Sequence, residues 1–480
     1  MKRHLFQFIS ISFFILATSC KPKQSSNDQE SEKPNIIFIL IDDMSVADLG
    51  CYGNDFHETP NIDSLAKKGV KFTNAYAASP VCSPTRASIL TGKYPVTVGI
   101  TDWITGKPSW ENEPLIAPEF AFELADEETT IAEKLKQNDY QTASFGKWHL
   151  GGEESLPTHH GFDTNVAGNE AGLPPSYFYP YTEGDFVLPD LHKNGEPGEF
   201  LTDRLTSEAM NWIKENPEKP FFLYLSYFTV HIWLETKPEL KEKYQQKQAE
   251  GDFKSYTNPV YAGMIETLDK NVGYIIDELE ALNILENTLI IFYSDNGGLH
   301  KDESENTPAT DNGIYREGKG HLYEGGIREP LIFYWKNKLQ KGVISDAIVT
   351  STDFYPTILD FCGVDYSATE TEGISFYSHL KHDSATARRN IYWHYPHYSY
   401  QLGKPGGAVR AGDFKLIQFY EDSSIELYNL AEDPGETRNI AEENPEKTAQ
   451  LQNALKNWLK DVNAKMPEKN PNFKSTKLEE

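Results

Sequence analysis

The sequence predicts an α/β fold with a mostly parallel sheet between helices, followed by a small α+β region with an antiparallel sheet. Three patterns predict it: continuous apolar runs that suit buried parallel strands, amphipathic helical segments between them, and short strands joined by tight turns after about residue 385. The composition, 39% hydrophobic and 24% charged over 480 residues, excludes a largely disordered or fibrous chain.

The first region contains four apolar runs, at residues 35–41, 220–230, 288–293 and 331–335. The first run, NIIFILI, has no polar face, so both faces of this strand must be buried. Thr59 and Pro60 predict the start of a helix, and Gly69 its end. A longer helix is predicted where apolar residues recur every three or four positions from Ile265 to Leu282.

The pattern changes in the smaller region. Short strands are predicted at residues 408–410, 415–420 and 425–429, joined by turns into an antiparallel meander. A helix follows, with apolar residues from Leu451 to Val462 on one face. We therefore expect a large domain, a second domain and a loose polar tail, over residues 34–384, 385–466 and 467–480.

The N-terminus has the pattern of a targeting segment, with a basic start and an apolar stretch too short to span a bilayer. Small residues directly before Cys20 resemble a bacterial lipoprotein cleavage site. Residues 1–19 are therefore predicted to be a signal peptide, Cys20 to carry lipid, and residues 20–33 to form a flexible tether. The alternative is an ordinary signal peptide cut near Ser19. We expect an exported protein in the periplasm or on the cell surface, whose only membrane anchor is the lipid.

The formal net charge of −27 excludes a general nucleic-acid binder, because phosphate backbones require basic patches. An anionic substrate must then be captured by a few local cations. Four cysteines in 480 residues exclude a disulfide scaffold. Cys51 and Cys362 are either buried thiols or one disulfide.

Two predicted strands run directly into oxygen-rich pairs. Asp42 and Asp43 follow the first run, and Asp295 and Asn296 follow the third. In an open parallel sheet, ligands bind beyond the carboxyl ends of the strands, so the two pairs are expected to converge. Three carboxylates and an amide oxygen are ligands that Ca²⁺ prefers. The alternative for either pair alone is a helix cap or a turn.

The strongest local signal is Cys82-x-Pro84-x-Arg86, which matches the site at which cysteine is oxidised to formylglycine. Residues 87–90 have a helical pattern, which places Cys82 near a helix N-terminus, where backbone N–H groups favour anions. The alternative is a free or buried thiol.

With these motifs the chain resembles the type I, formylglycine-dependent sulfatases of the alkaline phosphatase superfamily, over about residues 34–465. Further family motifs occur in the expected order: GKWHLG at 146–151, His231 after the second run, GKG at 318–320 and EGGIR at 324–328. The resemblance implies an alkaline-phosphatase-like large domain, Ca²⁺ and formylglycine as cofactors, and a maturation enzyme as a partner. The metal ligands that the resemblance implies are Asp42, Asp43, Cys82, Asp295 and Asn296. The catalytic residues that it implies are Cys82, Arg86, Lys147, His149, His231 and Lys319.

These residue types suit the hydrolysis of a sulfate ester. Formylglycine at position 82 would hydrate to a gem-diol, and Asp295 would take a proton that the cation has made more acidic. The two lysines, the arginine and the cation would stabilise charge on the sulfate oxygens. We expect His231 to protonate the leaving alcohol, with Lys319 as the alternative. We expect His149 to deprotonate the second hydroxyl and release sulfate.

Aromatic and polar segments predict a carbohydrate substrate. They resemble segments of bacterial carbohydrate sulfatases acting on galactose or N-acetylgalactosamine 4-sulfate, and they lie at residues 168–178, 392–398 and 406–410. We expect His394, His397 and Arg410 to line a sugar subsite. The alternative is that these residues pack the two domains together.

Two other functions remain open at this stage. A phosphodiesterase or phosphonate hydrolase of the same superfamily is one, although zinc-dependent relatives commonly have Asp-His where this chain has Asp295 and Asn296. A non-catalytic, glycan-binding surface lipoprotein is the other. The pattern departs from the family at Trp233 and His321, which affects the pocket wall beside the leaving group.

Overall fold

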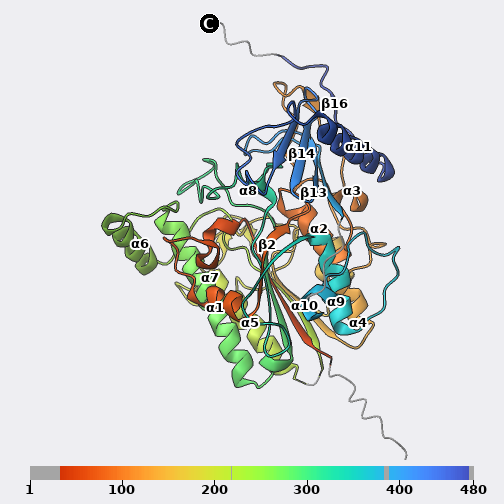
Figure 1. Ribbon diagram of the computed structural model, residues 1–480. Helices are drawn as coiled ribbons and strands as arrows, with labels where there is room; N and C mark the ends of the chain where they lie inside the picture. Colours follow the sequence, from red (N-terminus) through yellow and green to blue (C-terminus); the bar gives the residue numbers. More distant parts are fainter. Residues whose placement is uncertain (1–32, 218, 383–388, 475–480) are drawn as a thin grey trace, which may run out of the picture. The chain divides into compact units, whose positions relative to one another are not determined.

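An eight-stranded sheet forms the centre of the larger region of the computed structural model (Figure 1). The structure describes residues 33–217, 219–382 and 389–474. The predicted signal peptide, the lipidation at Cys20 and nearly all of the predicted tether lie outside these residues. In spatial order the strands are β11 (Val343–Thr350), β2 (Val70–Tyr76), β10 (Leu331–Trp335), β9 (Thr288–Ser294), β1 (Asn35–Ile41), β8 (Phe221–Ser226), β4 (Gln141–Gly146) and β5 (Thr164–Val166).

The sheet is mostly parallel, as predicted. Strand β1 pairs in parallel with β8 and β9, β4 with β8 and β5, and β11 with β2. Strand β10, the fourth predicted run, instead runs antiparallel to both β9 and β2. The carboxyl ends of β1, β4, β8 and β9 therefore lie at one edge of the sheet.

Helices cover both faces of this sheet (Figure 1). Ile37, Ile39 and Ile41 of β1 share one core with α1 (Pro60–Lys68), α5 (Leu201–Glu215) and α7 (Pro259–Ala281). Successive β1 side chains point to opposite faces, so Ile36, Phe38 and Leu40 join the other core. The helices of that second core are α2 (Cys82–Thr91), α4 (Ile131–Lys136), α9 (Phe354–Cys362) and α10 (Tyr377–His382).

The smaller sheet is antiparallel, with the order β12 (Asn390–Tyr395), β13 (Gly406–Ala411), β14 (Phe414–Phe419) and β15 (Ile425–Asn429). One face packs under α11 (Pro445–Asp461) through Leu451 and Leu455. The other face packs against the larger region, with Trp393 of β12 in a cluster with Tyr76 and Ile327. The three predicted strands of the meander are confirmed, and β12 is an additional strand.

Further elements lie outside the two sheets and the helices that pack on them. They are α3 (Pro95–Val98), α6 (Pro238–Glu250), α8 (Glu324–Ile327), the hairpin β6 (Thr182–Glu183) and β7 (Phe186–Val187), and 3-10 helices at Val46–Asp48, Gly50–Tyr52, Glu153–Ser155, Pro157–His160, Leu285–Asn287 and Ser351–Asp353. Cys51 and Cys362 are free thiols, not a disulfide. Among the described helices, none combines the length and apolarity needed to cross a membrane.

The predicted loose tail is held along its first residues, which corrects that expectation. Strand β16 (Glu468–Lys469) pairs with β3 (Leu115–Ile116), and Asn470 donates its backbone N–H to the Pro114 carbonyl at 2.9 Å. The polar side chains of this segment do not prevent strand pairing, because the hydrogen bonds are made by backbone groups.

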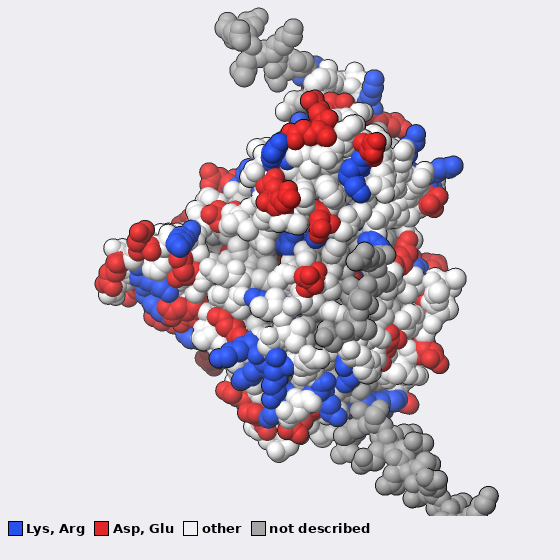
Figure 2. All heavy atoms as spheres, viewed as in Figure 1, with Lys and Arg blue, Asp and Glu red and all other residues white. Residues whose placement is uncertain are grey.

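On the face shown in Figure 2, acidic and basic side chains lie side by side over most of the surface, and basic side chains gather in the lower part of the view.

Candidate active site

The turn after β1 places Asp42 and Asp43 beside the turn after β9. The Asp295 side chain accepts the Asp43 backbone N–H at 3.2 Å, and the Asn296 amide donates to Asp43 Oδ1 at 2.7 Å. All four side chains are buried. The structure thus brings together the two predicted pairs, because β1 and β9 are neighbouring parallel strands in register.

This group of oxygens fits a hard cation. Asp42 Oδ1 and Asn296 Oδ1 are buried without a hydrogen-bond partner. Burial raises the pKa of Asp42 to about 8, and Asp295 and Asp43 add to this effect against the opposing charge of Lys147. Burial also opposes ionisation of Asp43, but Lys319 and His231 lower its pKa to about 2. Unpartnered acceptors and crowded carboxylates are the features that Ca²⁺ would satisfy.

Cys82 is the first residue of α2 and is buried beside these oxygens. Its Sγ lies 3.3 Å from Nδ1 of His149. Burial raises the pKa of the Cys82 thiol, although Lys147 and Lys319 lower it in part. An unmodified cysteine here is a neutral thiol, and thus a weak nucleophile.

Arg86, one turn along α2, connects the chain segments at the ends of β4, β8 and β9. Its Nε and Nη2 lie 2.8 and 2.6 Å from Asp295 Oδ2. Nη1 donates to the Ser226 hydroxyl at 2.6 Å and to the Lys147 carbonyl at 3.0 Å. The side chain is completely buried, so this fork fixes the ends of β4, β8 and β9 relative to Cys82.

The turn after β4 carries Lys147 and His149. Lys147 Nζ donates to Asp42 Oδ2 at 2.7 Å. His149 Nε2 is hydrogen-bonded to the Ile104 backbone carbonyl, which can only accept, so Nε2 carries the proton. Burial and the charge of Lys147 lower the pKa of His149 well below its usual value. The unprotonated Nδ1 therefore faces Cys82 as an acceptor.

His231 and Lys319 form the opposite side of the site. Lys319 Nζ donates to Asp43 Oδ2 at 2.7 Å and to His231 Nε2 at 2.8 Å. His231 Nδ1 lies 2.8 Å from the Ile232 carbonyl, so it is the protonated nitrogen. Burial and Lys319 lower the pKa of His231 well below its usual value. The available proton of this pair is therefore on Lys319.

The three residues predicted to line a sugar subsite are buried in contacts with other groups of the protein. Both His394 nitrogens are bonded, Nδ1 to the Tyr420 hydroxyl at 2.8 Å and Nε2 to the Lys465 carbonyl at 3.0 Å. Arg410 is buried between the sheets, where Nη1 donates to Asn74 at 3.0 Å and also bonds the Tyr76 hydroxyl. These contacts match the packing alternative, because buried polar groups need partners inside the protein.

His397 is also buried, but it supports a loop of the site. Its Nε2 lies 2.9 Å from the Thr101 hydroxyl, and Nδ1 lies 3.7 Å from Asp102 Oδ2. The same loop supplies the Ile104 carbonyl to His149. His397 thus contributes one layer away from the reacting groups.

Two contributors carried no recognisable sequence signal. Ile104 acts through its backbone carbonyl, which any residue provides. Ser226 ends β8 and accepts from Arg86 140 positions away in the sequence. Their roles depend on tertiary contacts.

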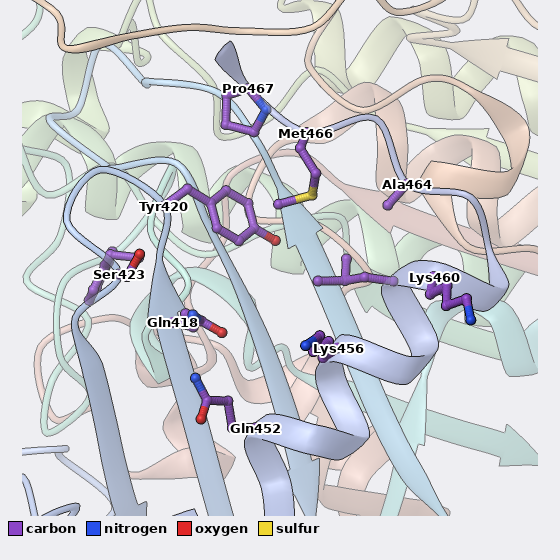
Figure 3. Close-up of a pocket in the computed structure, with 11 residues that line it drawn as sticks. Gln418, Tyr420, Ser423, Gln452, Lys456, Lys460, Ala464, Met466 and Pro467 are labelled. Carbon is purple, nitrogen blue, oxygen red and sulfur yellow. The ribbon is translucent and has the colours of Figure 1, made fainter. Parts of the chain in front are cut away.

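A separate cavity of about 560 Å³ lies between β14 and α11 (Figure 3). Tyr420, Lys456 and Met466 are among its lining residues, and none of the predicted catalytic or metal residues lines it. The cavity is therefore distinct from the candidate active site.

The buried oxygen cluster, Cys82 at a helix N-terminus and the two buried lysines form a site suited to the hydrolysis of a sulfuric ester. Comparison with known families agrees: the family model described as Sulfatase matches residues 34–364, and a model described as "N-sulphoglucosamine sulphohydrolase, C-terminal" matches residues 313–465. The chain belongs to the sulfatase family, within the alkaline phosphatase superfamily.

Similar proteins cover nearly the whole chain. A sulfatase of Formosa agariphila is 30% identical, over 95% of this chain and 94% of its own length. An N-acetylgalactosamine-6-O-sulfatase of Bacteroides thetaiotaomicron is 29% identical, over 92% and 96%. Among solved structures, Ps i-CgsB in complex with k-i-k-neocarrahexaose has a TM-score of 0.73 and 27% identity, and the match covers 89% of this chain and 93% of that chain.

Proposed function

We propose that this sulfatase removes sulfate from a sulfated carbohydrate, with formylglycine made from Cys82 as the nucleophile. One observation carries the proposal: the side chain of residue 82 lies 3.3 Å from an unprotonated histidine nitrogen. It lies in the same buried site as a set of oxygens suited to Ca²⁺.

The proposed metal ligands are residue 82 and the side chains of Asp42, Asp43, Asp295 and Asn296. Ca²⁺ bound there would act as a Lewis acid and would make a hydroxyl group of residue 82 more acidic. The protein contributes the fixed geometry, since Arg86 and Asn296 hold Asp295 and Asp43 in place.

His149 is positioned to accept a proton from residue 82. Its Nε2 proton is held by the Ile104 carbonyl, which leaves Nδ1 directed at the nucleophile. The neutral imidazole can accept a proton through this nitrogen.

Lys319 and His231 are positioned for the leaving alcohol. The proton lies on Lys319, with His231 as its acceptor, so we assign the proton donation to the Lys319–His231 pair rather than to His231 alone. Lys147 and Arg86 add positive charge around the sulfate oxygens.

The names of the relatives support a carbohydrate substrate. One acts on N-acetylgalactosamine 6-sulfate, and a structure 25% identical to this chain was solved with its substrate D-glucosamine-2-N,6-O-disulfate. The sequence motifs favour galactose or N-acetylgalactosamine 4-sulfate. Our proposal is the 4-sulfate, with the 6-sulfate of the same sugars as a second candidate favoured by these relatives.

The test is the release of inorganic sulfate by protein co-expressed with a formylglycine-generating enzyme. The panel contains the 4- and 6-sulfates of galactose and N-acetylgalactosamine, with glucosamine sulfates beside them. We expect release from one member, lowered by a factor of about 10³ or more in Cys82→Ala. A calcium chelator should abolish release, and added Ca²⁺ should restore it.

The mass of the peptide containing residue 82 is the control, because it shows whether conversion occurred. Converted protein that releases no sulfate from any member, or from oligosaccharides that contain the same sulfated sugars, would contradict the proposal. Equal turnover of a phosphodiester would favour a phosphodiesterase. Glycan binding that is unaffected by Cys82→Ala, without turnover, would favour a binding lipoprotein.

We also propose export and lipid anchoring at Cys20. The Cys20→Ser variant should then move from the membrane fraction to the soluble fraction of the bacterial host. An unchanged distribution between the fractions would contradict the anchor.

A further inference from the structure

Exposed aromatic rings gather beside the active site. Trp110 and Tyr400 are 46% and 45% exposed, which is unusual for large aromatic side chains. Their ring centroids lie 6.0 Å apart, and the Trp103 ring lies 6.1 Å from that of Tyr400. We call Trp103, Trp110 and Tyr400 the aromatic platform.

Both loops that carry the platform are attached to catalytic loops. Trp103 precedes Ile104, whose carbonyl bonds His149 and whose N–H donates to the Ser83 hydroxyl beside Cys82. Tyr400 precedes Gln401, whose carbonyl accepts from His321 Nε2 at 2.8 Å, two residues beyond Lys319. The platform therefore lies next to the site on the protein surface.

The backbone segments that carry the rings are held in place before any ligand arrives. Trp110 donates its backbone N–H to Glu113 at 2.8 Å, and Asn470 donates to the Trp110 carbonyl at 3.2 Å. The Tyr400 turn is closed by the Gly403 N–H, which donates to the Ser399 hydroxyl at 2.8 Å. A rigid aromatic surface loses little conformational freedom on binding.

The charge beneath the platform is neutralised. Lys107 Nζ lies 3.7 Å from the centre of the Trp110 ring, and it is paired with Glu113. The Lys107 side chain is only 2% exposed, whereas Trp110 remains 46% exposed and open to a ligand. A neutral aromatic face suits the C–H face of a sugar ring better than a second sulfate group.

We propose that the aromatic platform binds a further pyranose ring of the same glycan, beside the sulfated sugar. The preferred substrate is then an oligosaccharide rather than a monosaccharide. This inference rests on the proposed carbohydrate sulfatase function and names an additional subsite for it.

The test compares matched pairs of substrates. They are N-acetylgalactosamine 4- and 6-sulfate with the corresponding chondroitin sulfate tetrasaccharides, and galactose 4-sulfate with k-i-k-neocarrahexaose. The enzyme should prefer the oligosaccharide by about tenfold or more in kcat/KM. Trp110→Ala and Tyr400→Ala should each remove most of this preference by raising KM, with monosaccharide turnover unchanged. Trp110→Phe and Tyr400→Phe keep a ring and should retain most of it.

Tyr274→Ala is the matched control, because Tyr274 is 39% exposed on α7, and within the described residues its ring pairs with no ring of the platform. Equal losses on monosaccharide and oligosaccharide, or no loss on either, would overturn the inference. Sulfate release from no substrate would instead contradict the proposed function.

A binding measurement tests the platform independently of turnover. In the Cys82→Ala background, calorimetry with the same oligosaccharides should show affinity that Trp110→Ala weakens by about tenfold. Unchanged affinity, or no binding of any of these oligosaccharides, would overturn the inference.

Discussion

At the residue scale, single buried groups determine the chemistry of the site. The tautomer of His149 follows from one backbone carbonyl, that of Ile104. Arg86 binds Asp295, Ser226 and the turn after β4 beside Cys82. Each of these groups is inaccessible to solvent, so water cannot replace a missing partner.

Removal of the Arg86 side chain should therefore affect both stability and activity. Arg86→Ala leaves Asp295 buried without its counter-ion, and we expect the free energy of unfolding to fall by roughly 3–5 kcal/mol. Denaturant unfolding measures this change. Arg86→Lys keeps the charge but cannot reproduce the fork, so its loss should be smaller; a loss equal to that of Arg86→Ala would contradict a role for the charge.

The loop beneath the platform should make stability depend on pH. Burial raises the pKa of Asp102 to about 7, although hydrogen bonds from Trp103 and Tyr395 and the charge of Lys107 lower it in part. His397 is the other titratable group that faces it. Between about pH 4 and pH 7 only the folded state holds this proton, so the contribution of Asp102 to stability falls by at most about 1.4 kcal/mol per pH unit as pH rises. Burial lowers the pKa of His397 to about 3, and its contribution to stability has the opposite sign over this range.

Asp102→Asn should remove the contribution of Asp102 to this part of the stability curve, leave that of His397, and make the protein more stable than the wild type at pH 8. Thermal unfolding between pH 4 and pH 8 provides the measurement. Parallel pH curves for variant and wild type would show that Asp102 ionises normally in the fold.

At the scale of elements, the site depends on turns that touch through their backbones. Gly297 follows Asp295 and Asn296 at the end of β9, and its N–H donates to the Gly326 carbonyl at 3.1 Å. A Cβ at Gly297 would overlap the carbonyl oxygen of Gly325. The turn that carries Asp295 and Asn296 can therefore approach α8 only with glycine at this position.

Gly297→Ala should displace this turn, lower stability by about 1–3 kcal/mol and weaken Ca²⁺ binding. Calorimetric titration with Ca²⁺ and denaturant unfolding would show the two effects. Gly152→Ala provides a control, because the atoms nearest to the added Cβ would belong to the Glu170 side chain, the first of them at 3.3 Å. Similar effects of the two substitutions would argue against the backbone contact.

At the scale of the whole molecule, a buried ion cluster joins the two sheets. Lys415 of β14 lies 2.9 Å from Glu324 of α8 and 2.9 Å from Glu436, and all three side chains are completely buried. Burial opposes the ionisation of Glu324. The positive charges of Lys415, Arg328 and Arg410, in that order of effect, outweigh burial and hold the pKa of Glu324 well below its usual value. The position of the smaller sheet against the catalytic loops thus depends on satisfied charges.

Lys415→Met should leave two buried carboxylates without their shared cation and lower stability by roughly 3–5 kcal/mol. Adding Glu436→Gln to this variant should recover part of the loss. Arg438→Met breaks an exposed pair with Glu443 and should have no measurable effect in the same denaturant experiment. Equal effects of Lys415→Met and Arg438→Met would contradict a structural role for the cluster.

The sequence alone determined the features that depend on neighbouring residues. An apolar run followed by two oxygen-bearing residues predicted β1 with Asp42 and Asp43, and the same pattern predicted β9 with Asp295 and Asn296. The Cys82 motif and the start of α2 were also predictable. These patterns are local, because a strand, its end and a helix N-terminus are contiguous in the chain.

Only the tertiary structure decided how distant segments meet. It reversed β10 within the sheet, directed His394 and Arg410 into packing contacts, and joined Trp103 to Tyr400 across almost 300 positions. It also placed the proton of His149 through Ile104. Such contacts follow from burial and from the need of each enclosed polar group for a partner, which no local pattern records.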